Sequence, residues 1–354
     1  MTEVDITCLC GKVHTVVGLT QPLPVESYLC HQARCRYNLG ALCHSAIPLR
    51  TRPDGVDSLS VYAFDKGLQR YFCKTCGSHL FEGDACWKVQ SGVIDRIHSE
   101  QVYEALESIA GHHCVEETVD GGLSSCFIEP GASFGEEPVR KVELASQATN
   151  QHDALRMSAV VTEGNHARLQ ASCVCGGVQF FLTRPSDVSG LCSSPWPDLI
   201  VPYCAGSPVN TENKKWWIRG NKWLAGTCAC RSCRLGLGSP IQAWTFVSRC
   251  NILQLDGSPL VYTMGTLKSF ESSPGATREF CSKCGATVFW HNLERPGVVD
   301  VSVGLLRAPE GSLAKSWLYW LTERVSFAEK ALDKGLISTL EAGLGRLNVT
   351  TPLV

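Results

Sequence analysis

The chain has 354 residues, with 44% hydrophobic residues, 19% charged residues and a formal net charge of −2. This length suits two domains of ordinary size, and the composition is typical of a soluble globular protein. The near-neutral charge argues against a general binder of nucleic acid or of anionic membranes. No apolar run approaches the ~18 residues that span a bilayer and no secretory signal is evident, so we expect a cytoplasmic protein.

Alternating apolar and polar runs along the whole chain predict β-strands bounded by Gly, Pro and Asp. In chain order they include KVHTVVGL, SLSVYAF, LQRYF, ARLQASC, GVQFFLT and VVDVSVGLL. Helical patterns are sparse, and the best candidates start at Ser99 and at Ser326. Residues 131–165 are polar and lack sustained periodicity, so we expect a linker there.

Cysteine is the unusual component, with 20 in the chain. Thirteen of them lie in six motifs, which run CxCG, CxxxxC, CxxCG in the first half and again in the second. The motifs begin at Cys8, Cys30 and Cys73, and then at Cys173, Cys228 and Cys281. The offsets between the two sets are 165, 198 and 208 residues, so the second half carries insertions. We interpret this order as a tandem duplication.

Closely spaced cysteine pairs in an intracellular chain are typical of metal ligands. Structural zinc sites use four ligands in a tetrahedron, and thiolate sulfur suits them. The CxC and CxxC pairs are each followed by Gly, which lets backbone amides turn toward the sulfur atoms. We therefore expect one four-cysteine zinc site in each half. The expected ligands are Cys8, Cys10, Cys73 and Cys76 in the first half and Cys173, Cys175, Cys281 and Cys284 in the second.

The middle motif of the second half carries three cysteines, Cys228, Cys230 and Cys233. Three thiolates that leave one position open are typical of a reactive zinc site. Two alternatives stay open at this point: a zinc knuckle closed by an unseen fourth ligand, and a redox thiol cluster.

The middle motif of the first half has Gln32 where the second half has its central cysteine, which leaves Cys30 and Cys35. An amide oxygen replaces a soft thiolate poorly. Our hypothesis is that this half has lost its reactive zinc and keeps a remnant site, which makes about three zinc ions per chain. The alternative is that a neighbour such as Cys43 or His44 restores the site.

The order CxCG, CxCxxCR, FCxxCG resembles the glutathione-dependent formaldehyde-activating enzyme family, which includes centromere protein V. The second half is similar to fungal two-domain members in KKWWIRGNKWLAGTCACRSCR, REFCSKCGATVFW and VDVSVGLL. The resemblance implies β-tent domains built around a four-cysteine zinc, a second zinc on the CxCxxC cysteines, and the joining of formaldehyde to glutathione.

The fold expected from these observations is mainly β, with two tandem zinc-organised β-tent domains and few short helices. Residues 1–130 form the domain with the incomplete second zinc motif, and residues 131–165 form the linker. Residues 166–330 form the domain with complete motifs, and residues 331–354 form a C-terminal helical tail.

The expected function is that of a carbon–sulfur lyase, in which a thiol such as glutathione reacts with an aldehyde or another electrophilic small molecule in the second domain. The zinc ligands would not act as nucleophiles. Arg231 and Arg234 are candidates for binding substrate carboxylates, with surface solvation as the alternative. Trp217 and Trp223 are candidates for lining a substrate pocket, with packing of the insertion as the alternative.

The competing functions are a non-catalytic zinc-stabilised binding module and a pseudo-enzyme. A binder of nucleic acid or microtubules would be expected to carry a basic arm, which is missing here, so an enzyme is favoured. We expect no nucleic-acid or membrane partner, and the oligomeric state is not predicted. The remaining cysteines are expected to be core residues or free thiols: Cys43, Cys86, Cys114, Cys126, Cys192, Cys204 and Cys250.

Overall fold

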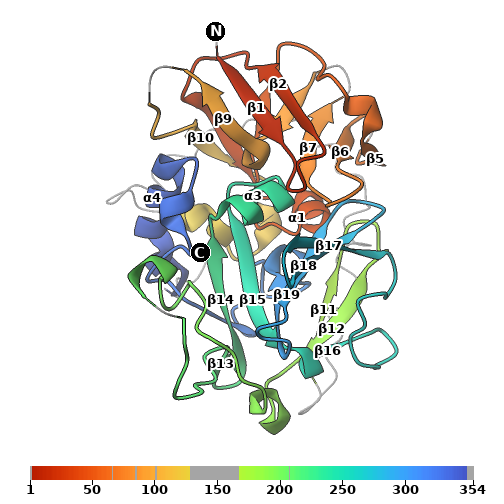
Figure 1. Cartoon of the computed structure of the whole chain (residues 1–354), viewed down its shortest axis with the longest axis vertical. Coiled ribbons are helices and arrows are strands. Elements are labelled where there is room, and N and C mark those ends of the chain that lie inside the picture. The colour runs from red at the N-terminus through yellow and green to blue at the C-terminus, as the bar shows by residue number, and fades with distance from the viewer. Residues whose placement is uncertain are drawn as a thin grey trace.

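The computed structural model describes residues 2–65, 67–83, 86–99, 102–127, 167–206 and 208–348. The expected linker at residues 131–165 lies outside the described residues. Strands predominate and the helices are short, which confirms the mainly β prediction. No described sheet mixes strands from before residue 128 with strands from after residue 166. Figure 1 shows the first half at the top and the second half below it. None of the described helices is long and apolar enough to cross a membrane.

Among the described residues, the first half contains three sheets. One has the order β2 (His14–Gly18), β1 (Glu3–Thr7), β9 (Ile94–His98), and a second pairs β10 (Glu107–His113) in parallel with β3 (Val25–Cys30). The third has the order β4 (Ala46–Pro48), β8 (Lys88–Gln90), β7 (His79–Gly83), β6 (Gln69–Phe72), β5 (Ser60–Ala63). Its helices are α1 (Ala33–Leu39) and the short 3-10 helices η1 (Val56–Ser58), η2 (Ser91–Val93), η3 (Val115–Thr118) and η4 (Gly122–Phe127).

The second half contains two sheets. The small one has the order β11 (Arg168–Ser172), β12 (Gln179–Thr183), β16 (Ile252–Leu253). The large one has the order β13 (Ile218–Arg219), β14 (Lys222–Cys228), β15 (Gln242–Ser248), β20 (Val298–Ser302), β19 (Thr287–Asn292), β18 (Ala276–Cys281), β17 (Leu267–Ser273), and β21 (Leu318–Trp320) pairs in parallel with β14.

The helices of the second half are also short. They are α3 (Arg231–Leu237), α4 (Lys334–Gly343) and the 3-10 helices η5 (Asp187–Gly190), η6 (Tyr203–Ala205), η7 (Arg249–Asn251), η8 (Val303–Leu305), η9 (Ala328–Lys330) and η10 (Leu344–Asn348). The helix predicted from Ser326 therefore begins only at Lys334, where the Asp333 side chain caps it. The helix predicted from Ser99 is wrong in its second part, because β10 occupies residues 107–113. Pairing with β3 outweighs the local helical pattern there.

The order of elements confirms the duplication. The run β3–α1–β4 matches β14–α3–β15, and β5 to β8 match β17 to β20. Both central helices have seven residues and end at a glycine with φ of 87°, Gly40 and Gly238. Each of these glycines is pressed against the other half, because a Cβ atom on Gly238 would lie 2.5 Å from the His79 carbonyl oxygen.

The two halves exchange a matching pair of aspartate contacts. Asp120, in the first half, accepts a hydrogen bond from the Leu313 amide at 2.8 Å. Asp333, in the second half, accepts hydrogen bonds from the amides of Leu106 and Glu107, each at 2.9 Å. In Figure 1, α1 and α3 lie between the two sets of strands. The helices that carry the middle cysteine motifs are therefore part of the contact between the halves.

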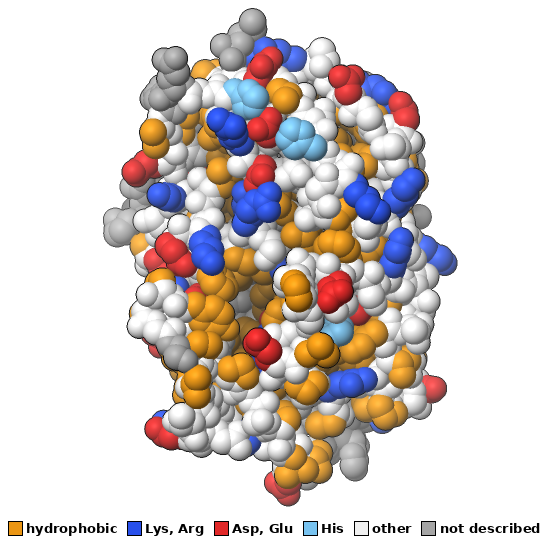
Figure 2. Space-filling view, viewed as in Figure 1, with side chains coloured by type: hydrophobic (Ala, Val, Ile, Leu, Met, Phe, Trp, Pro, Cys, Tyr) orange, Lys and Arg blue, Asp and Glu red, His pale blue; other side chains and the backbone are white. Residues whose placement is uncertain are grey.

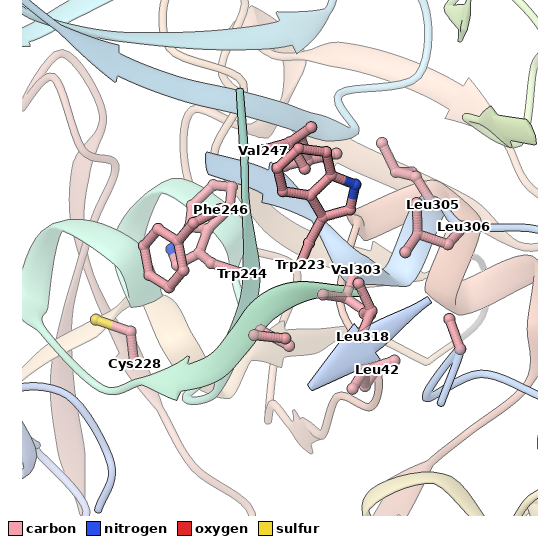
Figure 3. Packing of buried hydrophobic residues seen from close by; sticks show 14 of the residues in the cluster. Leu42, Trp223, Cys228, Trp244, Phe246, Val247, Val303, Leu305, Leu306 and Leu318 are labelled. Atoms are coloured by element: carbon pink, nitrogen blue, oxygen red, sulfur yellow. The ribbon is translucent and has the colours of Figure 1, made fainter. Parts of the chain in front are cut away.

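Strands β14 and β15 are neighbours in the large sheet of the second half. Every residue of β15 is buried, so this strand is covered on both faces. Figure 3 shows Trp223 of β14 near the aliphatic residues Val247 and Leu305, with Trp244 and Phe246 of the neighbouring strand β15 beside each other. Phe246 lies opposite Leu224, Trp244 opposite Gly226, and Cys228 ends β14. The hydrophobic core of the second half therefore packs directly against the strand that ends in Cys228.

Candidate metal centres

The two four-cysteine groups predicted from the motifs are assembled in the structure. In each group the sulfur atoms lie within 4.8 Å of one another, and all the described cysteines are free. The Cys10 and Cys73 sulfur atoms are 3.7 Å apart, and those of Cys175 and Cys281 are 3.5 Å apart. Four sulfur atoms at ~2.3 Å from one zinc ion would be separated by about 3.8 Å. The spacing and the donor chemistry therefore both fit zinc.

Each four-cysteine group is made by two turns between neighbouring strands. The CxC pairs follow β1 and β11, and the CxxC pairs follow or end β6 and β18. Backbone amides point at the sulfur atoms, as when the Val13 amide donates to Cys8 and the Val178 amide donates to Cys173, both at 3.3 Å. Such N–H···S bonds stabilise thiolates, which is the form that binds a metal.

The thiols within a group shift one another's pKa. Hydrogen bonds from Cys76 and Cys8 hold the pKa of Cys73 far below its usual range, and the same contact with Cys73 raises the pKa of Cys76. Several thiolates at this spacing repel one another, so a divalent cation is what allows all of them to stay ionised. The electrostatics therefore favour a metal at both groups.

The three cysteines of the second middle motif also come together, within 4.8 Å of one another. Cys228 ends β14, and Cys230 caps α3, where its sulfur accepts a hydrogen bond from the Cys233 amide at 3.3 Å. Two further donors, Trp244 Nε1 and Arg278 Nη2, each lie 3.4 Å from the Cys233 sulfur. Cys228 and Cys233 are buried while Cys230 is half-buried, so the group is accessible from one side.

A row of large side chains crosses the sheet beside this group. Phe246 of β15 lies opposite Asp300 of β20, Asp300 lies opposite Trp290 of β19, and Trp290 lies opposite Arg278 of β18. Directly opposite residues in antiparallel strands share one face, so the row runs continuously toward Cys233. Figure 2 shows a hollow rimmed by hydrophobic side chains in the second half, in front of the strands β14 and β15 of Figure 1.

The polar members of this row, Asp300 and Arg278, are buried. Arg295 forms an ion pair with Asp300 at 2.7 Å, and its guanidinium lies 4.7 Å from the centre of the Trp290 ring. Burial raises the pKa of Asp300 to about 6, against the opposing effect of Arg295. Within the described residues, Nε and Nη1 of Arg278 are buried without a hydrogen-bond partner. Sequence reasoning missed this row, although the alternation in QAWTFVS and TVFWHN indicates its inward face.

The two arginines predicted to bind substrate instead join the halves of the chain. Arg231 forms a bidentate ion pair with Asp95, at 2.8 and 2.7 Å. The Arg234 guanidinium is buried and donates to the carbonyls of Gly92 and Ile94 and to Asp95. Their charges are already compensated by the first half, which favours a structural role over the predicted binding of substrate carboxylates.

The two tryptophans predicted to line a pocket are core residues. Trp217 and Trp223 are both fully buried, and the Trp217 indole donates to Ser248 Oγ at 2.9 Å while that of Trp223 donates to the Thr183 carbonyl at 3.0 Å. Their indole groups stabilise the insertion, which corrects the pocket prediction. The neighbouring Trp216 lies beside the row, with its ring centre 5.0 Å from that of Phe246.

In the first half, the middle motif brings Cys30 and Cys35 together with His44, within 4.8 Å of one another. Gln32 stands beside them, with its Oε1 3.5 Å from the Cys35 sulfur. The neighbouring Cys43 is buried and belongs to the hydrophobic core. The three side chains that could hold a metal here include His44, which the sequence analysis gave, with Cys43, as the alternative to loss of the site.

The duplicated sheets, with two four-cysteine groups and a further three-cysteine group, define a tandem cysteine-rich protein whose cysteine groups could hold metal ions. The model of the family described as glutathione-dependent formaldehyde-activating enzyme matches residues 3–108 and again residues 209–322. The chain belongs to this family, as a tandem two-domain member. Comparison with curated proteins and with solved structures gave no significant match.

Proposed function

We propose that this protein is a zinc-dependent carbon–sulfur lyase that joins a thiol such as glutathione to an aldehyde, or reverses that reaction, at the three-cysteine group of its second half. The observation that carries the proposal is the three-cysteine group itself, which is accessible from one side. It lies at the Arg278 end of the row formed by Phe246, Asp300, Trp290 and Arg278. Cys228, Cys230 and Cys233 would hold the zinc. When bound, the zinc would supply an open position at which a substrate thiol stays ionised near neutral pH and so becomes a nucleophile.

The chain's own residues would position the reactants. Arg278 touches the Cys233 sulfur and has two buried donors without a partner among the described residues. We infer that these donors bind the aldehyde oxygen, which becomes an alkoxide as the carbon–sulfur bond forms. The bond that forms is sulfur to carbonyl carbon, the carbonyl π-electrons move to oxygen, and a proton from solvent completes the hemithioacetal.

The aromatic row favours an electrophile larger than formaldehyde. The corresponding row in the first half runs Pro48, Lys88, Glu82, Arg70, and ion pairs fill it, at 3.3 Å for Arg70 with Glu82. In the second half Phe246 and Trp290 replace Pro48 and Glu82, which places one aromatic ring on each side of the Asp300–Arg295 ion pair. Two aromatic side chains on this face suit an aldehyde or other electrophile with an aromatic or aliphatic body.

The test is turnover of glutathione with formaldehyde and with a series of larger aldehydes, followed by the appearance of the adduct. We expect the larger aldehydes to give the higher kcat/KM and Cys230→Ala to abolish the acceleration. Cys86→Ala changes an exposed cysteine outside every cysteine group and should leave the rate unchanged. Undiminished turnover by Cys230→Ala would remove this site from the chemistry, and no acceleration with any aldehyde would favour the non-catalytic binding module.

A further inference from the structure

The second half carries an insertion that packs on the face of the sheet that presents Cys228. Residues 184–221 separate β12 from β14, whereas only residues 19–24 separate β2 from β3, and we call residues 184–217 the insertion segment. A Cβ atom on Gly226 of β14 would lie 2.4 Å from Leu199 Cδ2, so the segment touches the backbone of that strand. Gly226 and Cys228 are two residues apart in one strand and therefore share a face.

The duplication shows why β14 has a glycine at this point. At the offset of 198 residues between the middle motifs, Gly226 corresponds to Tyr28 of β3. In the first half the Tyr28 ring fills this position and lies 4.6 Å from the ring of His113. In the second half Leu199 of the insertion segment takes the space next to the strand. A glycine in a strand interior is typical of such a close approach.

The end of the insertion segment contacts the row of large side chains. The Trp216 ring meets the Phe246 ring edge-on, with centres 5.0 Å apart. Arg295, which pairs with Asp300 of the row, lies 5.9 Å from the centre of the Trp216 ring. The Trp216 indole also donates to the Pro195 carbonyl at 2.8 Å, which ties an earlier part of the segment to the same place.

Asp198 fixes the middle of the insertion segment to the chain beside Cys228. Its buried carboxylate accepts hydrogen bonds from the Tyr203 amide at 2.9 Å, from Ser326 Oγ at 3.0 Å and from the Phe327 amide at 2.8 Å. Ser326 in turn pairs with Cys228 in a parallel bridge. One carboxylate therefore links Tyr203 to the residues that flank the three-cysteine group.

Tyr203 is held in place and is still accessible. Its ring meets the Phe327 ring edge-on at 5.6 Å between centres, and its hydroxyl donates to the Trp196 carbonyl at 3.3 Å. The residue is nevertheless 47% exposed. In Figure 1 the green chain to the left of β14 belongs to the insertion segment. An aromatic ring that is fixed and accessible is suited to pack against the body of a ligand.

We propose that Tyr203 determines which electrophiles react at the three-cysteine group, and that Asp198 is the positioning residue that holds it there. The inference rests on the proposed function of that group. The Tyr203 ring packs against the body of an aromatic or branched aldehyde, whereas formaldehyde has no body that reaches it. The insertion segment belongs to the second half, so this selection operates there alone.

The test is the ratio of kcat/KM for benzaldehyde to kcat/KM for formaldehyde, each with glutathione and the zinc-loaded full-length protein. We expect Tyr203→Ala to lower this ratio by about 3- to 10-fold, mainly through the KM for benzaldehyde, because one aromatic contact is lost. Asp198→Asn and Gly226→Ala should lower the ratio as well, since the first weakens the link to Tyr203 and the second displaces Leu199.

Tyr262→Ala is the matched control, because it removes an aromatic ring from the other face of the large sheet. The Tyr262 ring lies 6.3 Å from that of Phe289. Phe289 precedes Trp290 in β19, so the two side chains point to opposite faces. This variant should keep the ratio of the wild type. Equal decreases in Tyr203→Ala and Tyr262→Ala, or an unchanged ratio in Tyr203→Ala, would overturn the proposal.

Equilibrium binding separates this inference from the proposed function. S-benzylglutathione and S-methylglutathione carry a large and a small group on the same sulfur, and their binding requires no turnover. Titration calorimetry should show tighter binding of the benzyl compound, and Tyr203→Ala should reduce that preference by about 3- to 10-fold. This result without adduct formation from any aldehyde would refute the lyase and keep Tyr203 as a binding residue. A wild type without preference for the benzyl compound would overturn the inference even if aldehydes are turned over.

Discussion

Replacing Gly238 by Ala tests whether the helix that carries Cys230 and Cys233 depends on close contact between the halves. Gly238 ends α3 with φ of 87°, and an added Cβ atom would lie 2.5 Å from the His79 carbonyl oxygen. The left-handed backbone costs an alanine about 1–2 kcal/mol. Moving a packed backbone away from the new methyl group costs about 1–3 kcal/mol more. We therefore expect a loss of about 2–5 kcal/mol in the free energy of unfolding.

Gly55→Ala is the matched control, because Gly55 also has a left-handed backbone, with φ of 73°, but its added Cβ would meet nothing within 4 Å. That variant should lose only the backbone term, about 1–2 kcal/mol. The assay is urea unfolding of the zinc-loaded proteins, followed by tryptophan fluorescence. Equal losses in the two variants would refute the close contact between α3 and the first half. A loss of zinc in Gly238→Ala but not in Gly55→Ala would show that the contact also positions the cysteines.

Three further changes test other parts of the structure. Arg234→Ala should lower the free energy of unfolding in urea by about 2–4 kcal/mol, because it leaves buried carbonyls and Asp95 unpaired. Arg231→Ala removes an exposed ion pair and should cost under about 1 kcal/mol. Equal costs would contradict the burial assigned to Arg234. Burial lowers the pKa of His79 to about 3, so the unfolded state binds the proton first and stability falls as pH drops below ~6.5, by up to about 1.4 kcal/mol per pH unit. His79→Leu should reduce the slope of the unfolding free energy between pH 7 and pH 5.5, while the lowered pKa values of His31 and His112 keep part of it. An unchanged slope would contradict the assignment to His79. Arg278→Gln should lower kcat by about 100-fold with little change in KM for glutathione, and a change in KM alone would contradict the assigned contact with the aldehyde oxygen.

The cysteine groups were predictable because each depends on spacing within a short motif and on the repetition of that motif. The roles of Arg231 and Arg234 were not predictable, since their partner Asp95 lies 136 and 139 residues away and meets them only across the contact between the halves. Because both arginines lie close to Cys230 in the sequence, we expected them to bind substrate. In the folded chain their ion pairs and hydrogen bonds go to the first half instead.

The row of large side chains beside the three-cysteine group could not be predicted from the sequence, for a related reason. Phe246, Trp290 and Arg278 lie on three strands, and only the register of the sheet places them side by side. The indoles of Trp217 and Trp223 were more conspicuous in the sequence, yet they fill the core.

The most direct test of the proposed function is the proton balance of glutathione binding, measured by titration calorimetry in buffers of different ionisation enthalpy. A thiol that binds as thiolate at the second-half group must release about one proton per chain at neutral pH. We expect that release in the wild type, its absence with S-methylglutathione, and its loss in Cys230→Ala. Binding without proton release, or equal binding of the S-methyl compound, would contradict thiol activation at Cys228, Cys230 and Cys233.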